Sequence, residues 1–202
     1  YGDWSSDVCS SDLTGATLAP GVGAGTLLIS SNLSLNGGAT LAVELASTNT
    51  LGGGVNDLIS VAGALNLSGV NTLKVVPLGN LLLSTPYSFL AYTGALSGSA
   101  ANFTVTSDSR LTFAVDTTTP GRVNVSATGG TPLLLEWSGG LAALPNTWDT
   151  RNSGNWLGAI FGDQFFAGDT VVFNDFATEF SVTLNGDLYP ANTQIEIGRA
   201  HV

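Results

Sequence analysis

Short runs of alternating apolar and polar residues dominate the chain, and this alternation constrains the fold more than any other feature. A period of two places every second side chain on one face of an extended strand, so each run predicts a half-buried β-strand. Turn-forming Gly, Asn, Ser and Thr separate the runs, and helix signals are nearly absent. The runs are TLLIS (26–30), NLSLN (32–36), TLAVEL (40–45), ALNLS (64–68), TLKVV (72–76), FTVTS (103–107), LTFAVD (111–116) and RVNVSA (122–127). The sequence therefore predicts an all-β fold.

Part of this pattern recurs, which indicates how the strands are arranged. Residues 28–43 (LISSNLSLNGGATLAV) align with residues 58–75 (LISVAGALNLSGVNTLKV) when two residues are inserted in the second copy. Stacking such copies about 4.8 Å apart places like residues over like and builds a continuous core. The repeat therefore predicts a parallel β-helix, or β-solenoid.

The repeat also predicts a register. Leu33 should lie beside Leu65, with both side chains facing inward. In the same way, Leu41 should lie beside Leu73. An antiparallel β-sandwich uses the same alternation and is the competing architecture, but it would not stack copies of one unit in parallel.

The composition changes near residue 130, which predicts a second module. Residues 14–130 are interpreted as the end of one β-solenoid module, closed by a hairpin over residues 116–125 with Pro120-Gly121 as its turn. Residues 131–195 carry three of the four Trp residues and are interpreted as the Trp-rich start of the next β-repeat module.

The two ends of the chain are related at the level of DNA. DVCSSDL (7–13) and EIGRAHV (196–202) can be encoded by one DNA segment read on opposite strands, and that segment resembles a sequencing-library adapter. We therefore interpret residues 1–13 and 196–202 as non-native segments, and we expect them to pack poorly and to add no strand to a core. The remainder is then expected to be an internal piece of a longer chain.

The composition excludes several kinds of chemistry from that remainder. The single Cys and the single His, Cys9 and His201, lie in the two end segments. Without them, Ser-His and Cys-His catalysis and His-ligated metal sites are not available. A net charge of -10 at pH 7 disfavours nucleic acid and anionic membranes as partners. No apolar run approaches the ~20 residues of a transmembrane helix, so we expect no membrane insertion.

Two stretches resemble a known family. Residues 17–45 (TLAPGVGAGTLLISSNLSLNGGATLAVEL) and 55–67 (VNDLISVAGALNL) are similar to the passenger-type β-helix repeats of bacterial autotransporter-like surface proteins. The later W-S-G-G, T-W-D-T and F-x-x-G-D-T-V-V-F-N-D motifs resemble the opening of an autotransporter-associated β-strand repeat module. The resemblance implies a right-handed parallel β-helix, secretion to the bacterial cell surface in association with the outer membrane, and no catalytic residues.

Aromatic residues in the second half are the first candidate site. Trp137, Trp148 and Trp156 could form a platform on which sugar rings stack, which would make this half a carbohydrate-binding module. The alternative is that these large side chains are buried and cover the solenoid where one module meets the next. Exposed, coplanar rings would favour sugar binding, and buried rings would favour the structural role.

Acidic residues in the same half are the second candidate site. Oxygen ligands from loops suit calcium, and the candidates are Asp163, Asp169, Asp175 and Glu179. Their spacing matches neither an EF-hand loop nor a calcium-binding β-roll. The alternative is turn chemistry, in which Asp169 and Asp175 accept hydrogen bonds from backbone amides.

These observations predict a structural or adhesive segment of a large exported bacterial surface protein, without catalysis and without a required cofactor. Its expected partners are neighbouring repeat modules of the same chain and surface glycans. Two alternatives remain: a carbohydrate-binding module, and a polysaccharide-acting β-helix enzyme. The enzyme would need a basic residue as its base, and only four scattered basic residues lie outside the end segments.

Overall fold

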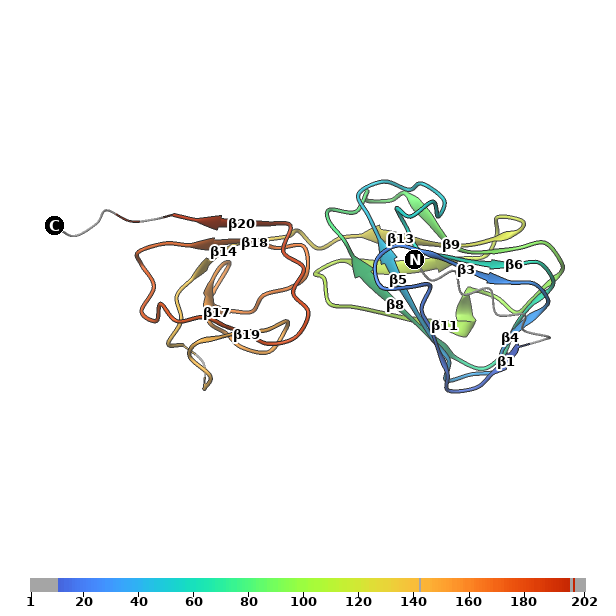
Figure 1. Ribbon diagram of the computed structural model, residues 1–202, viewed down its shortest axis with the longest axis horizontal. Coiled ribbons are helices and arrows are strands. Elements are labelled where there is room, and N and C mark those ends of the chain that lie inside the picture. Colours follow the sequence, from blue (N-terminus) through green and yellow to red (C-terminus); the bar gives the residue numbers. More distant parts are fainter. Residues whose placement is uncertain (1–10, 142, 197, 199–202) are drawn as a thin grey trace. The chain divides into compact units, whose positions relative to one another are not determined.

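The computed structural model describes residues 11–141, 143–196 and 198, and it divides the chain into two compact units (Figure 1). The first unit comprises Tyr1–Val76, Leu81–Ser107 and Leu111–Gly129. The second unit comprises Pro77–Asn80, Asp108–Arg110 and Gly130–Val202, so two short segments from earlier in the sequence belong to it.

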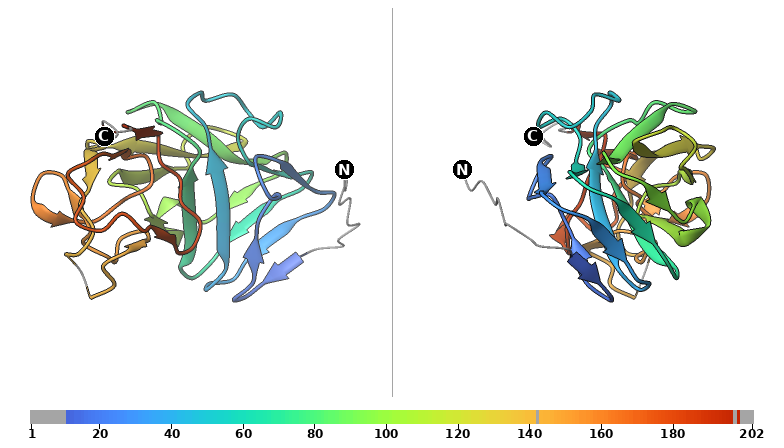
Figure 2. Two further views of the ribbon diagram at one scale, coloured as in Figure 1. Left: turned by 60° about the vertical axis from the view of Figure 1, so that its left-hand side comes forward. Right: turned by 90° about the vertical axis from the view of Figure 1, so that its right-hand side faces the viewer.

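The first unit is built from three sheets, and the chain visits them in the same order on each turn. Figure 2 shows strands of successive turns side by side, in sequence order from blue to green. The first sheet contains β1 (Ser11–Leu13), β4 (Leu33–Leu35), β7 (Leu65–Leu67) and β10 (Leu96–Ser97). The second contains β2 (Thr17–Leu18), β5 (Thr40–Leu45), β8 (Asn71–Pro77) and β11 (Phe103–Ser107). The third contains β3 (Thr26–Ile29), β6 (Leu58–Val61), β9 (Pro86–Tyr92), β13 (Arg122–Thr128) and β12 (Thr112–Asp116).

The two leucine pairs predicted from the internal repeat are confirmed, but the alignment of residues 28–30 with 58–60 is wrong by two positions, because Leu28 pairs with Ser60 in the ladder between β3 and β6. Leu33 pairs with Leu65 in the parallel ladder between β4 and β7. On the second sheet β5 and β8 are neighbours, and the Thr72 amide donates to the Ala39 carbonyl at 2.7 Å, which places Leu73 beside Leu41. All four leucine side chains are fully buried. The unit is therefore a parallel β-solenoid, and the β-sandwich alternative is wrong for it.

The predicted hairpin is also present. β12 and β13 pair in antiparallel fashion, and β13 continues the third sheet by pairing in antiparallel fashion with β9. The chain reverses through Pro120 and Gly121, and Gly121 has a φ of 74°. A 3-10 helix at Ala100–Asn102 lies between β10 and β11.

One expectation about the chain ends is wrong. Residues 11–13 form β1, which pairs in parallel with β4, and Leu13 packs against the core of the first unit. Asp12 and Leu13 continue the polar–apolar alternation of the solenoid strands, and a solenoid turn presents an unpaired edge that any such strand can extend. Val8 and Cys9 lie outside the described residues.

A glycine pair shapes one corner of the first unit. Gly37 and Gly69 both have positive φ, at 92° and 58°, and lie on successive turns. A Cβ on Gly69 would stand 2.9 Å from the Gly37 Cα, closer than ordinary packing permits. Asn71 lies next to this corner, and its side chain is fully buried. The Asn71 Oδ1 accepts hydrogen bonds from the backbone amides of Gly37 (3.2 Å) and Ala39 (3.3 Å). Glycine at this corner therefore lets successive turns approach closely enough to pair.

The second unit also pairs strands in parallel, but its turns differ in length: Thr170 pairs with Asn192, 22 residues later (192 minus 170). Its five-stranded sheet contains, in order, β17 (Phe161–Asp163), β16 (Trp156–Leu157), β14 (Leu134–Trp137), β18 (Thr170–Phe173) and β20 (Asn192–Ile195). A separate parallel pair joins β15 (Thr147–Trp148) to β19 (Thr183–Leu184). Leu134 pairs with Thr170, and Thr147 pairs with Thr183, so one turn advances by 36 residues (170 minus 134, and 183 minus 147). Within the described part of the chain, no helix is long and apolar enough to cross a membrane.

Candidate functional site

The three candidate tryptophans lie inside the second unit. Trp137, Trp148 and Trp156 are 2%, 6% and 0% exposed. Trp137 and Trp156 face each other across the antiparallel pair of β14 and β16, and Trp148 enters from β15. The prediction that at least two of the three are mostly buried is confirmed, and the rings form the unit's own core. That core consists of Leu135, Trp137, Trp148, Trp156, Phe165, Val171 and Ala177.

The ring geometry is that of a packed core. Trp156 meets Trp137 and Trp148 edge to face, with ring centroids 5.0 and 5.3 Å apart and planes at 78° and 75°. Phe165 and Phe173 pack against the same rings. Edge-to-face contacts of this kind are the favoured arrangement of buried aromatic side chains. A sugar platform needs exposed, coplanar rings, and these three do not provide it.

The indole nitrogens differ in their hydrogen bonding. The Trp137 Nε1 donates to the Glu179 carbonyl at 2.7 Å. The Nε1 atoms of Trp148 and Trp156 are buried and have no hydrogen-bond partner among the described residues. A buried donor without a partner costs on the order of 1–3 kcal/mol. The two indole N–H groups without partners therefore offset part of the stabilisation that burial of the rings provides.

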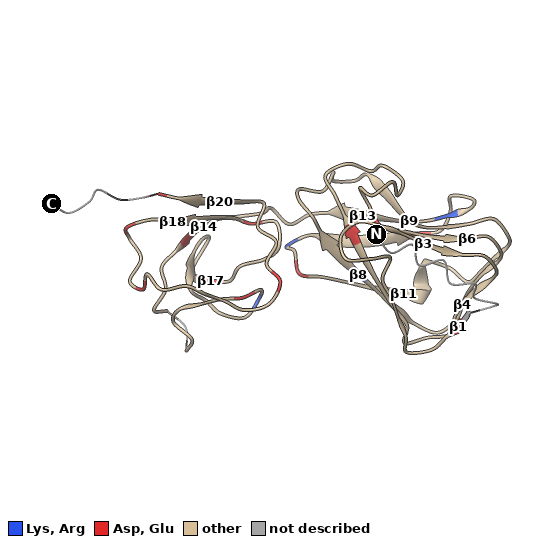
Figure 3. Cartoon of the chain, viewed as in Figure 1, with Lys and Arg blue, Asp and Glu red and all other residues tan. Residues whose placement is uncertain are grey.

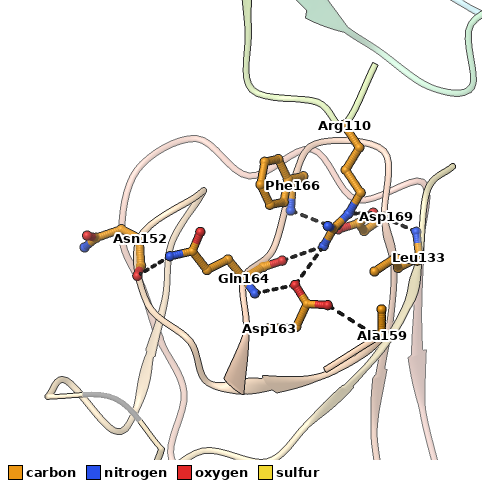
Figure 4. Close-up of polar contacts among 8 residues, drawn as sticks. All are labelled: Arg110, Leu133, Asn152, Ala159, Asp163, Gln164, Phe166 and Asp169. Carbon is orange, nitrogen blue, oxygen red and sulfur yellow. Dashed lines mark hydrogen bonds and ion pairs between the residues drawn. The ribbon is translucent and has the colours of Figure 1, made fainter. Parts of the chain in front are cut away.

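Arg110 holds two of the four acids that sequence suggested as calcium ligands (Figure 4). Its Nε donates to Asp169 at 3.0 Å, and its Nη2 donates to Asp163 at 3.2 Å. The guanidinium also donates to the Gln164 carbonyl at 2.8 Å and lies 4.3 Å from the centre of the Phe166 ring. A carboxylate in this setting accepts short, charge-assisted hydrogen bonds, which are stronger than neutral ones.

Backbone amides complete the coordination of both carboxylates. Asp169 has a fully buried side chain, and its two oxygens accept from the amides of Leu133 (2.8 Å) and Phe166 (3.0 Å). Asp163 accepts from the amides of Gln164 (2.8 Å) and Ala159 (3.2 Å). The prediction that Asp169 binds backbone amides at a turn is confirmed; for Asp175 it stays a prediction.

The four acids are not gathered as a metal site. No group of three or more His, Cys, Asp or Glu side chains is placed to hold a metal ion among the residues described. Glu179 accepts from the Ser181 amide at 2.9 Å in a turn of its own. A cation at Asp163 and Asp169 would have to displace Arg110, whose guanidinium already forms an ion pair with each of them. The pair therefore serves to fix the chain around it.

Sequence reasoning did not find the role of Arg110. The residue lies between β11 and β12, two strands of the first unit, whereas its partners lie more than fifty positions later. Charged residues are few throughout (Figure 3), so no local cluster marked it. A second missed residue is Asp149, which is buried and accepts from the Ser153 amide at 2.7 Å and the Ser153 hydroxyl at 2.9 Å.

The first unit contains a different acidic pair. The Asp57 carboxylate accepts from the amides of Gly25 (2.7 Å) and Glu44 (2.8 Å), which joins three segments of the chain. Burial raises the pKa of Asp57 above its ordinary value. Burial, and secondarily the charge of Asp57, raise the pKa of Glu44 as well. One Glu44 oxygen, Oε2, is buried without a hydrogen-bond partner among the described residues.

An all-β chain whose successive turns pair in parallel and stack like residues over like is a β-solenoid repeat protein. The chain is 34% identical over 146 residues to "Adhesin BmaC autotransporter" of Brucella suis biovar 1 (strain 1330). It belongs to the passenger-type β-helix proteins of bacterial autotransporters. The match covers 71% of this chain but 4% of that much longer relative. No protein-family model matches the chain, and no solved structure matches it significantly.

Proposed function

We propose that the chain is a structural, non-catalytic segment of an exported bacterial surface adhesin. The observation that carries the proposal is the leucine ladder of the first unit, where Leu33 and Leu65 stack in register and are fully buried. Such a ladder uses the repeated positions of the sequence to hold one turn against the next. Repetition of this kind serves the building of an extended, stable segment.

The polar groups support the same proposal. Asp57 binds backbone amides, and Asp163 and Asp169 bind both backbone amides and Arg110. A paired-carboxylate hydrolase needs two carboxyls that flank a substrate, and a lyase needs a base. In this chain the buried carboxylates of Asp57, Asp163 and Asp169 instead accept hydrogen bonds that hold neighbouring segments of the backbone together.

The relative's name supplies the cellular setting. That protein is an autotransporter adhesin, so we place this chain at the bacterial surface, in association with the outer membrane. Neighbouring repeat modules are its proposed partners, because β20 is exposed along its whole length and pairs with β18 on one side. A strand from such a module could extend the sheet there.

A second candidate is adhesive contact through exposed aromatic side chains of the second unit, with surface glycans or host proteins as the partners. Phe161, Phe176 and Phe180 are 77%, 79% and 72% exposed. Exposed apolar side chains mark an interaction surface where they form one contiguous patch. Sugar stacking on Trp137, Trp148 and Trp156 is not part of the proposal, because those rings are buried.

Beads coated with the purified chain provide the test. As a structural segment, the chain should resist a nonspecific protease that digests the Leu65→Ala variant, and its beads should bind host cells no better than albumin-coated beads. It should also release no reducing ends from cell-wall or plant polysaccharides. Cell binding that disappears in a Phe161→Ser, Phe176→Ser and Phe180→Ser variant would favour the adhesive candidate. Polysaccharide cleavage would contradict both.

A further inference from the structure

Two Asn-Gly turns occupy equivalent places in the two units. Asn36-Gly37 follows β4, and Asn185-Gly186 follows β19. In both turns, the backbone N–H of the asparagine donates at 2.9 Å to a backbone carbonyl of the preceding turn of the chain. Both glycines have positive φ, at 92° and 86°. The backbone of the two turns is therefore closely matched, and any difference between them arises from what surrounds them.

The first turn is covered by the next turn of the solenoid. The Gly37 amide donates to the Asn71 Oδ1 at 3.2 Å, and Asn71 is fully buried. The Asn36 Oδ1 accepts from the Ser68 hydroxyl at 3.2 Å. Both groups that would have to react with each other in this turn, the glycine amide and the asparagine side chain, are thus held by other partners.

The second turn has no such cover among the residues described. Asn185 and Gly186 are both exposed. Within the described chain, no group accepts a hydrogen bond from the Gly186 amide, and no group binds the Asn185 side chain. The backbone of Asn185 is fixed by its bond to the Trp148 carbonyl, but the reacting groups beyond it are open to water.

We propose that Asn185 is a site of spontaneous deamidation and that Asn36 is protected from it. The Gly186 amide nitrogen, after losing its proton, attacks the Asn185 Cγ and forms a new N–C bond. The bond from Cγ to Nδ2 breaks, and ammonia leaves with the proton from the glycine amide. Water then opens the resulting succinimide ring at either carbonyl, which yields aspartate or isoaspartate. The net reaction consumes one water and releases one ammonia.

Glycine makes this attack possible because it has no side chain to block the approach of its nitrogen. In the first turn the same attack requires the Gly37 amide to leave Asn71 and the Asn36 side chain to leave Ser68. The solenoid therefore protects a reactive dipeptide wherever a following turn supplies the acceptor. The inference is independent of the function proposed above, because it depends on the turn alone.

The product changes the surface beside β19. Either outcome adds one negative charge next to Asp187, and isoaspartate also lengthens the backbone by one atom immediately after the strand. The backbone N–H of Asn185 donates to the Trp148 carbonyl at the end of the ladder between β15 and β19. Lengthening the backbone at Asn185 should weaken this hydrogen bond. A chain that has aged should therefore differ from a fresh one at this turn.

The test is peptide mapping by mass spectrometry of the folded chain held at mildly alkaline pH. Asn185 should convert on the order of tenfold faster than Asn36, the factor expected when a hydrogen bond must break before the reaction can occur. The same incubation in concentrated urea should bring the two rates together, since both dipeptides are Asn-Gly. Equal rates in the folded chain, or faster conversion of Asn36, would overturn the proposal.

Two variants sharpen the result. Asn71→Ala removes the acceptor of the Gly37 amide, so it should raise the Asn36 rate towards that of Asn185; circular dichroism establishes that the variant is still folded. If it is not, the comparison of folded and urea-treated wild type still decides the matter. Asn185→Gln should abolish the product at that position, because a glutamine would have to close a larger ring. Persistence of the new charged species in that variant would show that it arises elsewhere.

Discussion

The two units use the same parallel pairing but fill their interiors differently. The first unit stacks leucine, isoleucine and valine from turn to turn, with Phe89 and Phe103 among the few rings. The second unit is filled by Trp137, Trp148 and Trp156. Turn length varies within both units. The first advances by 22 residues from Ser11 to Leu33 (33 minus 11) and by 32 from Leu33 to Leu65 (65 minus 33). The second advances by 36 from Leu134 to Thr170 (170 minus 134) and by 22 from Thr170 to Asn192 (192 minus 170). The two units therefore differ in the size of the side chains that fill them and not in a uniform length of turn.

The buried acids differ in parallel with the cores. In the first unit, Asp57 binds backbone amides, and burial, followed by the charge of Asp57, raises the pKa of Glu44. In the second unit, Asp163 and Asp169 share Arg110. A buried carboxylate needs either hydrogen-bond donors or an opposite charge. The first unit satisfies this need mainly with its own backbone, and the second adds a cation.

The largest expected effect is that of Trp148→Ala. Removing a buried ring that contacts Trp156, Phe165 and Phe173 should lower the free energy of unfolding by about 3–5 kcal/mol. Denaturant unfolding measures the loss. Trp148→Phe is the matched control, because it keeps a ring and removes the buried Nε1 without a partner, so it should cost much less. A Trp148→Ala variant as stable as the wild type would contradict the packed aromatic core.

Leu65→Ala should have the next largest effect. Leu65 lies between Leu33 and Leu96 in the ladder of the first sheet and is fully buried. The cavity should cost about 2–5 kcal/mol. The neighbouring Asn66 faces outward on the same strand, so Asn66→Ala should change stability by less than about 0.5 kcal/mol. Equal losses in the two variants would mean that the ladder does not carry the stability of this unit.

Arg110→Met should have a smaller effect, confined to the second unit. The substitution keeps the aliphatic stem but leaves Asp163 and Asp169 without their cation. Because backbone amides still bind both carboxylates, we expect a loss of about 1–3 kcal/mol, below that of a fully buried pair. Unfolding in denaturant measures it.

Two further arginine variants control this experiment. Arg110→Lys retains the charge but cannot present two nitrogens at fixed geometry to two acids, so its stability should lie between those of Arg110→Met and the wild type. Arg122→Met removes an arginine of the first unit whose guanidinium donates to the Gly121 carbonyl, and it should cost less than Arg110→Met. Should the Arg110 variants match the wild type, the acids of the second unit would need no cation.

Sequence predicted the first unit more fully than the second, for a physical reason. The pairing of Leu33 with Leu65 could be predicted because each copy of the repeat carries an inward-facing leucine at the same position. Burial of the tryptophans could also be predicted, since large rings among Gly and Asn turns have few other ways to be stabilised. The edge-to-face partners could not, because they come from strands joined by irregular loops.

Contacts between distant residues with no repeated pattern were beyond the sequence. Arg110 reaches Asp169 across 59 positions, and nothing near either residue marks the pair. Asp57 and Glu44 are closer in sequence, but their approach depends on how the loop between β5 and β6 folds back. The pairing of β1 with β4 was also not predicted from the sequence. β1 pairs with β4 although its residues lie outside the internal repeat.

The smallest expected effect concerns the pH dependence of the acidic pair in the first unit. The folded pKa values of Glu44 and Asp57 lie above the ordinary values of 4.5 and 3.8, so the folded chain holds these protons more tightly than the unfolded chain does. Stability from the pair is therefore fully present below the ordinary values and is lost as pH rises through the folded values. Asp116 acts in the opposite sense, because hydrogen bonds from Thr118 lower its pKa. Its contribution is present above 3.8 and is lost as pH falls through its folded value.

The two contributions therefore fall in different pH windows and can be separated. Glu44→Gln removes one charge of the pair, so the stability of this variant relative to the wild type should increase as pH rises from about 4 to neutrality. Denaturant unfolding of both proteins across that range gives the difference directly. Asp116→Asn should leave this part of the profile unchanged and alter only the region below 3.8. A difference between Glu44→Gln and the wild type that is flat with pH, or that falls as pH rises, would show that burial and the charge of Asp57 do not raise the pKa of Glu44. The contrast with the Arg110 pair would then be lost.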